Sequence, residues 1–341
     1  MTYSVSFLAH LRAIKECLPK FEASARCNLR TGGLEIRARG RCVELHPQFA
    51  FPQNGSIAYS LKLEAHMEFF VGWRPYVNRV WPLSYDKKSF KDFCAQSGLR
   101  TPRSWQQAQS VSENVLVKHA TSSFCRGISG PFTQEGLKGA NRALQQGEFF
   151  EEFIQGDIVK VWYWNANPVA LEVLPMPTVT GDGSSSLRKL LGRKAVAHLP
   201  GNDWDVWAAV AAFQGLTLDS VIAAGKKVLV DFRYLSSLHP FAPNAQNLNV
   251  LADYEGTPLM NQLRAAGKPF WEAIPAEIRP DTLYSIDAMI DGQRNALFLE
   301  MNCNPAVHPD AYAAMFESLF GAAVAVRPPG SAAVGLKIAA A

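Results

Sequence analysis

Short apolar runs between turn signals predict several strands after residue 110. The run ENVLVKHA ends in a lysine and is typical of a strand, and KVLVDFRYL has a similar pattern. The segment FFEEFIQGDIVKVWYWNANPVALEVLPMP predicts two further strands around a turn at residues 165–168. SIDAMIDGQRNALFLEMN predicts a hairpin that turns at Asp291-Gly292.

Helical spacing begins after residue 84. Ser84 is a candidate N-cap, Phe90 and Cys94 recur at helical spacing, and Gly98 is placed to end the helix. WDVWAAVAAFQGL and TLDSVIAAG also have helical patterns, and the first residues of the chain predict an amphipathic element. We expect residues 236–250 to form a long loop and residues 321–341 to form a mobile tail.

The N-terminal part gives weaker signals, and residues 47–83 cannot be assigned. Thr31-Gly32-Gly33 could turn one short strand into another. Arg37, Arg39 and Arg41 alternate, so on a strand they would project from one face. We favour a solvated face for these arginines over a surface that binds an anionic substrate.

Composition and charge exclude several classes of protein. Of 341 residues, 48% are hydrophobic and 19% are charged, which excludes intrinsic disorder and fibrous architecture. The net charge of +4 is too small to indicate a nucleic-acid partner. No apolar run reaches the roughly 18 to 20 residues that span a bilayer, so we expect no membrane partner. The six cysteines contain no CxxC pair, which favours reduced thiols and a cytoplasmic location.

The predicted hairpin at residues 285–302 carries the most informative chemistry. It would bring the strand with Asp287 beside the strand with Glu300 and Asn302. Glu300 and Asn302 are two residues apart, so their side chains would share a face of the strand. Two carboxylates and an amide oxygen form a site suited to magnesium, which takes further ligands from phosphates. An ordinary polar surface hairpin is the alternative, and these three residues alone do not decide between the two.

Five other segments occur in a fixed order before this hairpin. Asp86-Lys87 opens the first predicted helix, and VLVKHATSSFCRGIS places a lysine at a strand end before a loop with Ser and Gly. EEFIQGD, PTVTGDGSSSLRKLL and LDSVIAAGKKVLVDFRYLSS follow. Together with the hairpin they resemble the ATP-grasp superfamily, and especially the ATP-grasp part of cyanophycin synthetase and of ribosomal-protein glutamate ligases. The resemblance covers roughly residues 84–320.

The resemblance implies how a nucleotide would bind. Two lysines would neutralise phosphates, the loop after the second lysine would close over them, and the hinge EEFIQGD would hold adenine and ribose. The implied residues are Lys87, Lys118, Arg126, Gly127, Glu151, Glu152, Phe153, Ile154 and Asp157.

The resemblance also implies a metal site and a catalytic cation. Asp287, Glu300 and Asn302 would hold magnesium on the β- and γ-phosphates of ATP. Arg233, together with Lys118, is the candidate to stabilise an acylphosphate, although a surface ion pair is an equally good interpretation of Arg233. The chain departs from the family pattern where relatives carry arginines, because Lys160 and Leu174 stand near those positions. Substrate identity therefore does not follow from the resemblance.

The implied fold is α+β: an ATP-grasp fold with two α/β subdomains that clasp the nucleotide. We expect a divergent N-terminal domain over residues 1–83 and an ATP-grasp domain over residues 84–320. Within the latter, a lid subdomain would span about residues 104–150, and residues 321–341 would form a flexible tail.

The implied activity is ATP-dependent ligation of a carboxylate to an amine through an acylphosphate, with release of ADP and phosphate. A small-molecule or peptide acid and amine would be the partners, and a homodimer is an option that the sequence leaves open. The loop at residues 236–250, with His239 and Asn244, would border the acceptor pocket. An ATP-grasp kinase and a non-catalytic nucleotide-binding regulator are the alternatives.

Overall fold

The computed structural model describes residues 7–53, 56–62, 69–122, 127–140, 142–194, 203–239, 248–323 and 336–339. In these ranges helices pack against four sheets. Neighbouring strands in the sheets are antiparallel, except that β1 and β16 are parallel. This mixture confirms the predicted α+β class. Within the same ranges, the helices are too short or too polar to cross a membrane.

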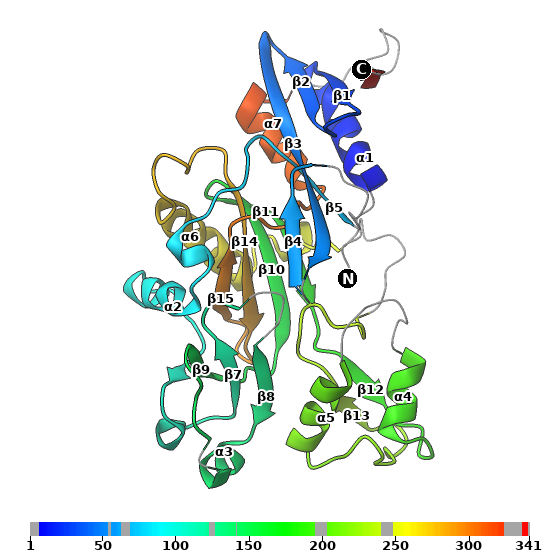
Figure 1. The fold of residues 1–341 in the computed structure, drawn as a ribbon, viewed down its shortest axis with the longest axis vertical. Coiled ribbons are helices and arrows are strands. Elements are labelled where there is room, and N and C mark those ends of the chain that lie inside the picture. The colour runs from blue at the N-terminus through cyan, green and yellow to red at the C-terminus, as the bar shows by residue number, and fades with distance from the viewer. Residues whose placement is uncertain are drawn as a thin grey trace.

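The central sheet has the strand order β11-β10-β14-β15 and lies in the middle of Figure 1. Its strands are β10 (Asp157–Trp164), β11 (Asn167–Leu174), β14 (Leu283–Ile290) and β15 (Ala296–Asn302). Tyr163 and Tyr284 stack on one face of the sheet, where they belong to a core that contains Phe270 of α6 (Pro258–Glu272). Since side chains alternate along a strand, Lys160 and Asp287 lie on the opposite face.

Two smaller units lie below the central sheet in Figure 1. One is a sheet of order β6-β9-β7-β8 with α3 (Gln134–Ala140). Its strands are β6 (Ser104–Trp105), β7 (Val115–His119), β8 (Ile128–Phe132) and β9 (Glu148–Glu152). The other joins β12 (Thr178–Thr180) and β13 (Lys227–Leu229) to α4 (Leu187–Lys194) and α5 (Asp203–Phe213). Helix α2 (Lys87–Gln96) packs beside β15.

The N-terminal sheet forms the upper part of Figure 1. Its strands are β1 (Ser24–Asn28), β2 (Leu34–Ala38), β3 (Arg41–Gln53), β4 (Ser56–Ser60), β5 (Phe69–Arg74) and β16 (Leu336–Ala339). Helices α1 (Phe7–Cys17) and α7 (Ala311–Phe320) pack on it, and one core joins Ile36, Trp164 and Phe316. This core therefore contains residues from both sides of residue 83, where the sequence predicts a domain boundary. The boundary itself stays a prediction.

Several predicted elements differ from the structure. The helix after residue 84 is capped by Asp86, whose side chain accepts hydrogen bonds from Lys88 and Ser89, and not by Ser84. The strand expected in KVLVDFRYL ends at Leu229. The predicted tail contains β16, which pairs in parallel with β1.

The predicted helix over TLDSVIAAG is wrong. These residues form turns and one isolated bridge, because their carbonyl groups bond to another segment of the chain. The carbonyls of Leu218, Ser220 and Ile222 accept hydrogen bonds from the backbone amides of Arg188, Leu187 and Gly183. A carbonyl that is used in this way cannot accept the helical bond from the residue four positions later.

Arg37, Arg39 and Arg41 do not lie along one strand, which differs from our expectation. Arg39 and Gly40 form the turn between β2 and β3, and Arg39 has a φ of 51°. Arg39 donates to the carbonyls of Phe320 and Ala322, and Arg41 donates to that of Leu319. These two arginines therefore cap the C-terminal end of α7, where free carbonyls attract cations.

A glycine in α6 allows the helix to approach the turn between β10 and β11. A Cβ atom at Gly267 would lie 2.0 Å from the Ala166 carbonyl oxygen, whereas one at Gly192 in α4 would meet nothing within 4 Å. We expect Gly267→Ala to lower the free energy of unfolding by about 1–3 kcal/mol because the helix must shift. Gly192→Ala is the control and should raise it by about 0.5–1 kcal/mol. Urea denaturation measures both, and equal stabilities would contradict the close packing.

Candidate functional site

Four charged residues lie in one row across the central sheet. Lys160 on β10 is directly opposite Glu172 on β11 on one side and Asp287 on β14 on the other. Asp287 is in turn opposite Glu300 on β15. Since directly opposite residues point to the same face, the four side chains form a continuous charged row on the face away from α6.

A β-bulge places Glu300 in this row. From Ile290 to Ala288 the strands pair in regular register, so Ala288 is opposite Phe298. Asp287, however, pairs with Glu300, and Leu299 is the extra residue. Without the bulge, Leu299 would be opposite Asp287 and Glu300 would point to the other face of the sheet.

Two lysines pair with the carboxylates that we predicted to be metal ligands. Lys160 Nζ lies 2.6 Å from Asp287 Oδ1, and Lys87 Nζ lies 2.8 Å from Glu300 Oε2. Asn302 Nδ2 donates to Asp287 Oδ2 at 3.1 Å. The three predicted ligands are therefore brought together, each with a nearby positive or hydrogen-bonding partner.

The electrostatics of this group favour a cation. Burial raises the pKa of Glu300, the neighbouring Asp287 raises it further, and Lys87 opposes both effects. Within the described part of the chain, no group of three His, Cys, Asp or Glu residues could hold a metal ion. The set here consists of two carboxylates and one amide oxygen, a combination of hard oxygens that fits magnesium when phosphates complete the coordination.

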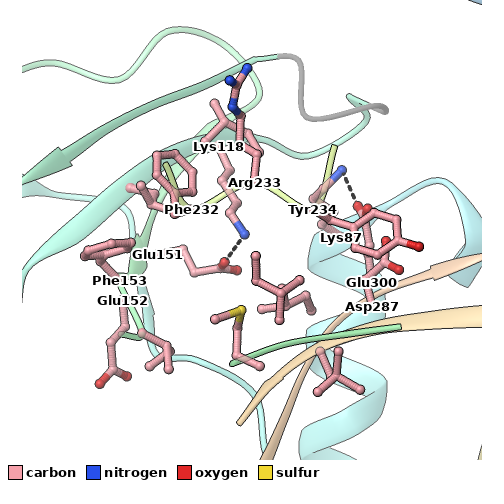
Figure 2. Close-up of a pocket in the computed structure, with 18 of the residues that line it drawn as sticks. Lys87, Lys118, Glu151, Glu152, Phe153, Phe232, Arg233, Tyr234, Asp287 and Glu300 are labelled. Carbon is pink, nitrogen blue, oxygen red and sulfur yellow. Dashed lines mark ion pairs between the residues drawn. The ribbon is translucent and has the colours of Figure 1, made fainter. Parts of the chain in front are cut away.

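A second group of charges lies between α2 and the sheet that contains β7. The Glu151 side chain is 1% exposed and pairs with Lys118 through one oxygen and with Lys91, at 2.8 Å, through the other. Burial raises the pKa of Glu151, but the two lysines outweigh it and hold the pKa below its usual value. Figure 2 shows Lys118 pointing to Glu151 and Lys87 pointing to Glu300.

A pocket that is partly open to solvent lies between these charged groups. Its apolar part comes from β7, β8, the segment after β9, and the central sheet, and its lining includes Leu116, Ile128, Phe153, Ile154, Ile158, Met176, Phe232, Met289 and Leu299. Lys87, Lys118, Asp287 and Glu300 line its polar end. An apolar pocket with a few charged groups at one end is the usual form of a small-ligand site.

The predicted hinge lines the same pocket. Glu151, Glu152, Phe153 and Ile154 are among the lining residues. The Phe153 amide donates to the Asn114 carbonyl, but the Ile154 amide has no acceptor within the described residues. Asp157 begins β10 opposite Ile290 and does not line the pocket.

The predicted phosphate loop is described only in part. Lys87 Nζ donates to the Ser122 carbonyl, and Ser122 lines the pocket. Arg126 lies outside the described residues. Gly127 has a φ of 59° and its carbonyl accepts from the His119 amide, so it closes the base of the loop without lining the pocket.

Arg233 lines the pocket, but its guanidinium pairs with a buried carboxylate. Its Nη2 and Nε lie 2.7 Å and 3.0 Å from the two oxygens of Asp231. In Figure 2 the guanidinium points away from Glu151 and Asp287. The His239 ring bonds to the Arg233 carbonyl. The described residues of the predicted acceptor loop, 236–239 and 248–250, do not line this pocket, and Asn244 lies outside them.

Sequence patterns did not identify Glu172 and Lys91 as site residues. Glu172 is 1% exposed, accepts from the Tyr234 hydroxyl at 3.0 Å, and lies 3.9 Å from His308 Nε2. Burial raises the pKa of Glu172 to about 8, against an opposing effect of Lys160. Lys91 follows Lys87 by four residues in α2, so both side chains lie on one face of the helix. This spacing was the sequence signal that could have identified Lys91.

Comparisons with known proteins found matches among solved structures only. No family model and no curated protein matches the sequence. Among solved structures, the chain is similar to a bifunctional glutathione synthetase from Pasteurella multocida (14% identity, TM-score 0.35), covering 82% of this chain and 37% of that one. It is also similar to a D-alanine–D-alanine ligase from Bacillus anthracis (11% identity, TM-score 0.34), covering 70% and 66%.

A third similar structure is the ATP-grasp ligase PsnB in complex with a minimal precursor, at 11% identity and a TM-score of 0.33, covering 69% of this chain and 60% of that one. The chain spans less than two thirds of the first of these proteins. At such low identities, the roles of single residues rest on the contacts described above.

Glu172 predicts a pH dependence of stability. Its pKa is raised from 4.5 to about 8 in the folded protein, so the folded state holds a proton that the unfolded chain releases. Stability should therefore fall as the pH rises from 4.5 to 8. Burial lowers the pKa of His308 from 6.5 to about 4, which has the opposite effect below pH 6.5.

Between pH 6.5 and 8 the His308 contribution is constant, and comparison with a variant that cannot titrate at position 172 removes the contributions of the other groups. There we expect wild type to lose up to about 1.4 kcal/mol of stability per pH unit relative to Glu172→Gln, which cannot titrate. Denaturation at several pH values measures this slope, and the exposed Glu277→Gln is the control. Parallel slopes for wild type and Glu172→Gln would contradict a buried, protonated Glu172.

Proposed function

We propose that this protein binds ATP in the described pocket and ligates a carboxylate to an amine through an acylphosphate, with release of ADP and phosphate. The observation that carries the proposal is the group of charged side chains at the polar end of an apolar pocket. There, Asp287 and Glu300 face each other while Lys87 and Lys118 approach from two other elements.

The apolar end of the pocket suits the adenine ring. Leu116, Phe153 and Met176 line it, and the Ile154 amide could donate to a ring nitrogen because it has no acceptor in the described part of the chain. The phosphates would then extend toward Lys87 and Lys118. Both lysines pair with carboxylates here, so the phosphates would compete for cations that are already in position.

The residues at the polar end fit a magnesium ion. Asp287, Glu300 and the Asn302 amide oxygen would hold it, and when bound it would neutralise charge on the β- and γ-phosphates. Two facing carboxylates are unfavourable without a cation. Lys87 and Lys160 supply that positive charge in the structure described here.

The chemistry requires positioning more than covalent participation by the protein. The acid substrate would attack the γ-phosphorus, ADP would leave, and the amine would then displace phosphate from the acylphosphate. Lys118 would stabilise charge on the transferred group. Arg233 is a candidate for the same role from the other side, held in place by Asp231.

The nucleotide assignment predicts a selective effect at Lys118. Lys118→Ala should weaken ATP binding by at least about 10-fold, on the scale of one charge-assisted hydrogen bond. Adenosine binding should change little, because the lysine contacts phosphate and not the base. Calorimetric titration with ATP and adenosine measures the difference.

The matched control is Lys91→Ala. Lys91 shares the Glu151 partner with Lys118 but does not line the pocket, so the variant disturbs the same ion pair without removing a phosphate contact. Its ATP-to-adenosine affinity ratio should stay close to that of wild type. An equal loss of both ligands in Lys118→Ala would argue against a phosphate role.

Product analysis tests the reaction itself. A screen of paired amino acids and small acids with ATP and magnesium should release phosphate and ADP only when both an acid and an amine are present. Asp287→Asn and Glu300→Gln should lose at least about 10²-fold of that turnover while remaining folded. A phosphorylated product with no free phosphate would show a kinase instead, and ATP binding without turnover on any pair would favour a regulator.

A further inference from the structure

Arg74, the last residue of β5, is a buried cation that has no carboxylate partner among the residues that the structure describes. Its side chain is 1% exposed. Nη1 donates to Asn304 Oδ1 at 2.7 Å and Nη2 donates to Asn78 Oδ1 at 2.8 Å. Nε has no partner among the described residues. Amide oxygens carry only partial charge, and burying an ion without a counter-ion is strongly unfavourable.

The tyrosines around Arg74 do not supply the missing negative charge. Burial raises the pKa of Tyr59 to about 12 and also raises the pKa values of Tyr76 and Tyr312, although Arg74 lowers all three. These phenols are therefore neutral at physiological pH. The positive charge of Arg74 is balanced only by dipoles within the part of the chain that the structure describes.

A buried amide, Gln48, shares a hydrogen-bond acceptor with Arg74. Gln48 on β3 is fully buried, and its Oε1 has no hydrogen-bond partner in the described ranges. Its Nε2 lies 3.3 Å from Asn78 Oδ1, the same atom that accepts from Arg74. Asn78 itself is exposed to solvent. One exposed amide oxygen, Asn78 Oδ1, therefore accepts hydrogen bonds from two buried side chains.

This arrangement matches the way arginine binds a carboxylate. The N–H groups of Nε and Nη2 are parallel and donate to the two oxygens of a carboxylate. At Arg74, Nε has no hydrogen-bond partner among the described residues, Nη2 donates to Asn78, and the Tyr76 hydroxyl also interacts with the side chain. Rotation of the Asn78 side chain would free Nη2, while Nη1 would stay on Asn304.

The position of Arg74 connects it to the proposed ligase site. Asn304 follows the predicted metal ligand Asn302 by two residues, a span of about 7 Å in extended chain. Asn304 also bonds to the backbone of Arg79, so the segment after β5 is fixed to the end of β15. The chain and these hydrogen bonds therefore connect Arg74 to the strand end that carries Asn302.

We propose that the Nε–Nη2 edge of Arg74, with Gln48 Nε2, binds a carboxylate group of the non-nucleotide substrate, one that is not itself activated. The source of the carboxylate rests on the proposed function. The site as such requires no nucleotide, so it can be tested alone with acetate as the probe.

Asn78→Asp supplies the missing carboxylate from an exposed position, where a folding defect is not expected. It should raise the melting temperature relative to wild type by a few degrees, because the aspartate pairs with Arg74. Acetate should raise the melting temperature of wild type and of Asn78→Ala more than chloride does at equal ionic strength, since a ligand of the folded state stabilises it. In Asn78→Asp the aspartate side chain occupies the site, so the melting temperatures in acetate and in chloride should be equal.

A general salt effect would be the same in all three proteins, so the comparison removes it. Equal acetate-minus-chloride differences in wild type, Asn78→Ala and Asn78→Asp, or no stabilisation by Asn78→Asp, would overturn the proposal. ATP titration of the same proteins separates it from the proposed function. An acetate effect that persists in a protein that binds no ATP would leave the carboxylate site standing and remove the nucleotide site.

Discussion

The facing of Asp287 and Glu300 across two strands is the constraint on which the rest of the site depends. Like charges directly opposite each other on a sheet repel, and partial burial strengthens the repulsion. The structure meets this cost with a lysine on each side, Lys160 from the neighbouring strand and Lys87 from α2. The tyrosine and phenylalanine core on the other face keeps the strands in register.

In the second charged group, too, lysines neutralise a buried carboxylate. Glu151 holds Lys118 at the polar end of the pocket, but it also pairs with Lys91, which is outside the pocket. If Lys118 turns to a phosphate, Lys91 remains to neutralise the buried glutamate. The arrangement lets one lysine change partners without leaving an unpaired buried charge, which would otherwise cost several kcal/mol.

Apolar runs predicted the strands around the site because β10 and β14 are buried on both faces. These runs and the turn at Asp291-Gly292 were sufficient to predict that Asp287 would lie near Glu300. The bulge at Leu299, which actually turns Glu300 to the right face, leaves no mark in a single sequence, because it depends on how the strands pack.

Tertiary contacts explain the remaining differences. TLDSVIAAG has helical spacing, yet its carbonyls bond to residues 183–188, and such partners are invisible to a local pattern. Arg39 and Arg41 looked like one charged face, but Gly40 makes them part of a turn against α7. Arg74 gave no signal at all, since burial without a counter-ion is a property of the folded chain.

The core that joins the N-terminal sheet to α7 has a consequence for the cooperativity of folding. Trp73 and Tyr312 are both fully buried and bonded to each other, although 239 residues separate them. The first 74 residues and the segment after the charged row therefore stabilise one another, and neither can open without exposing the other's apolar surface.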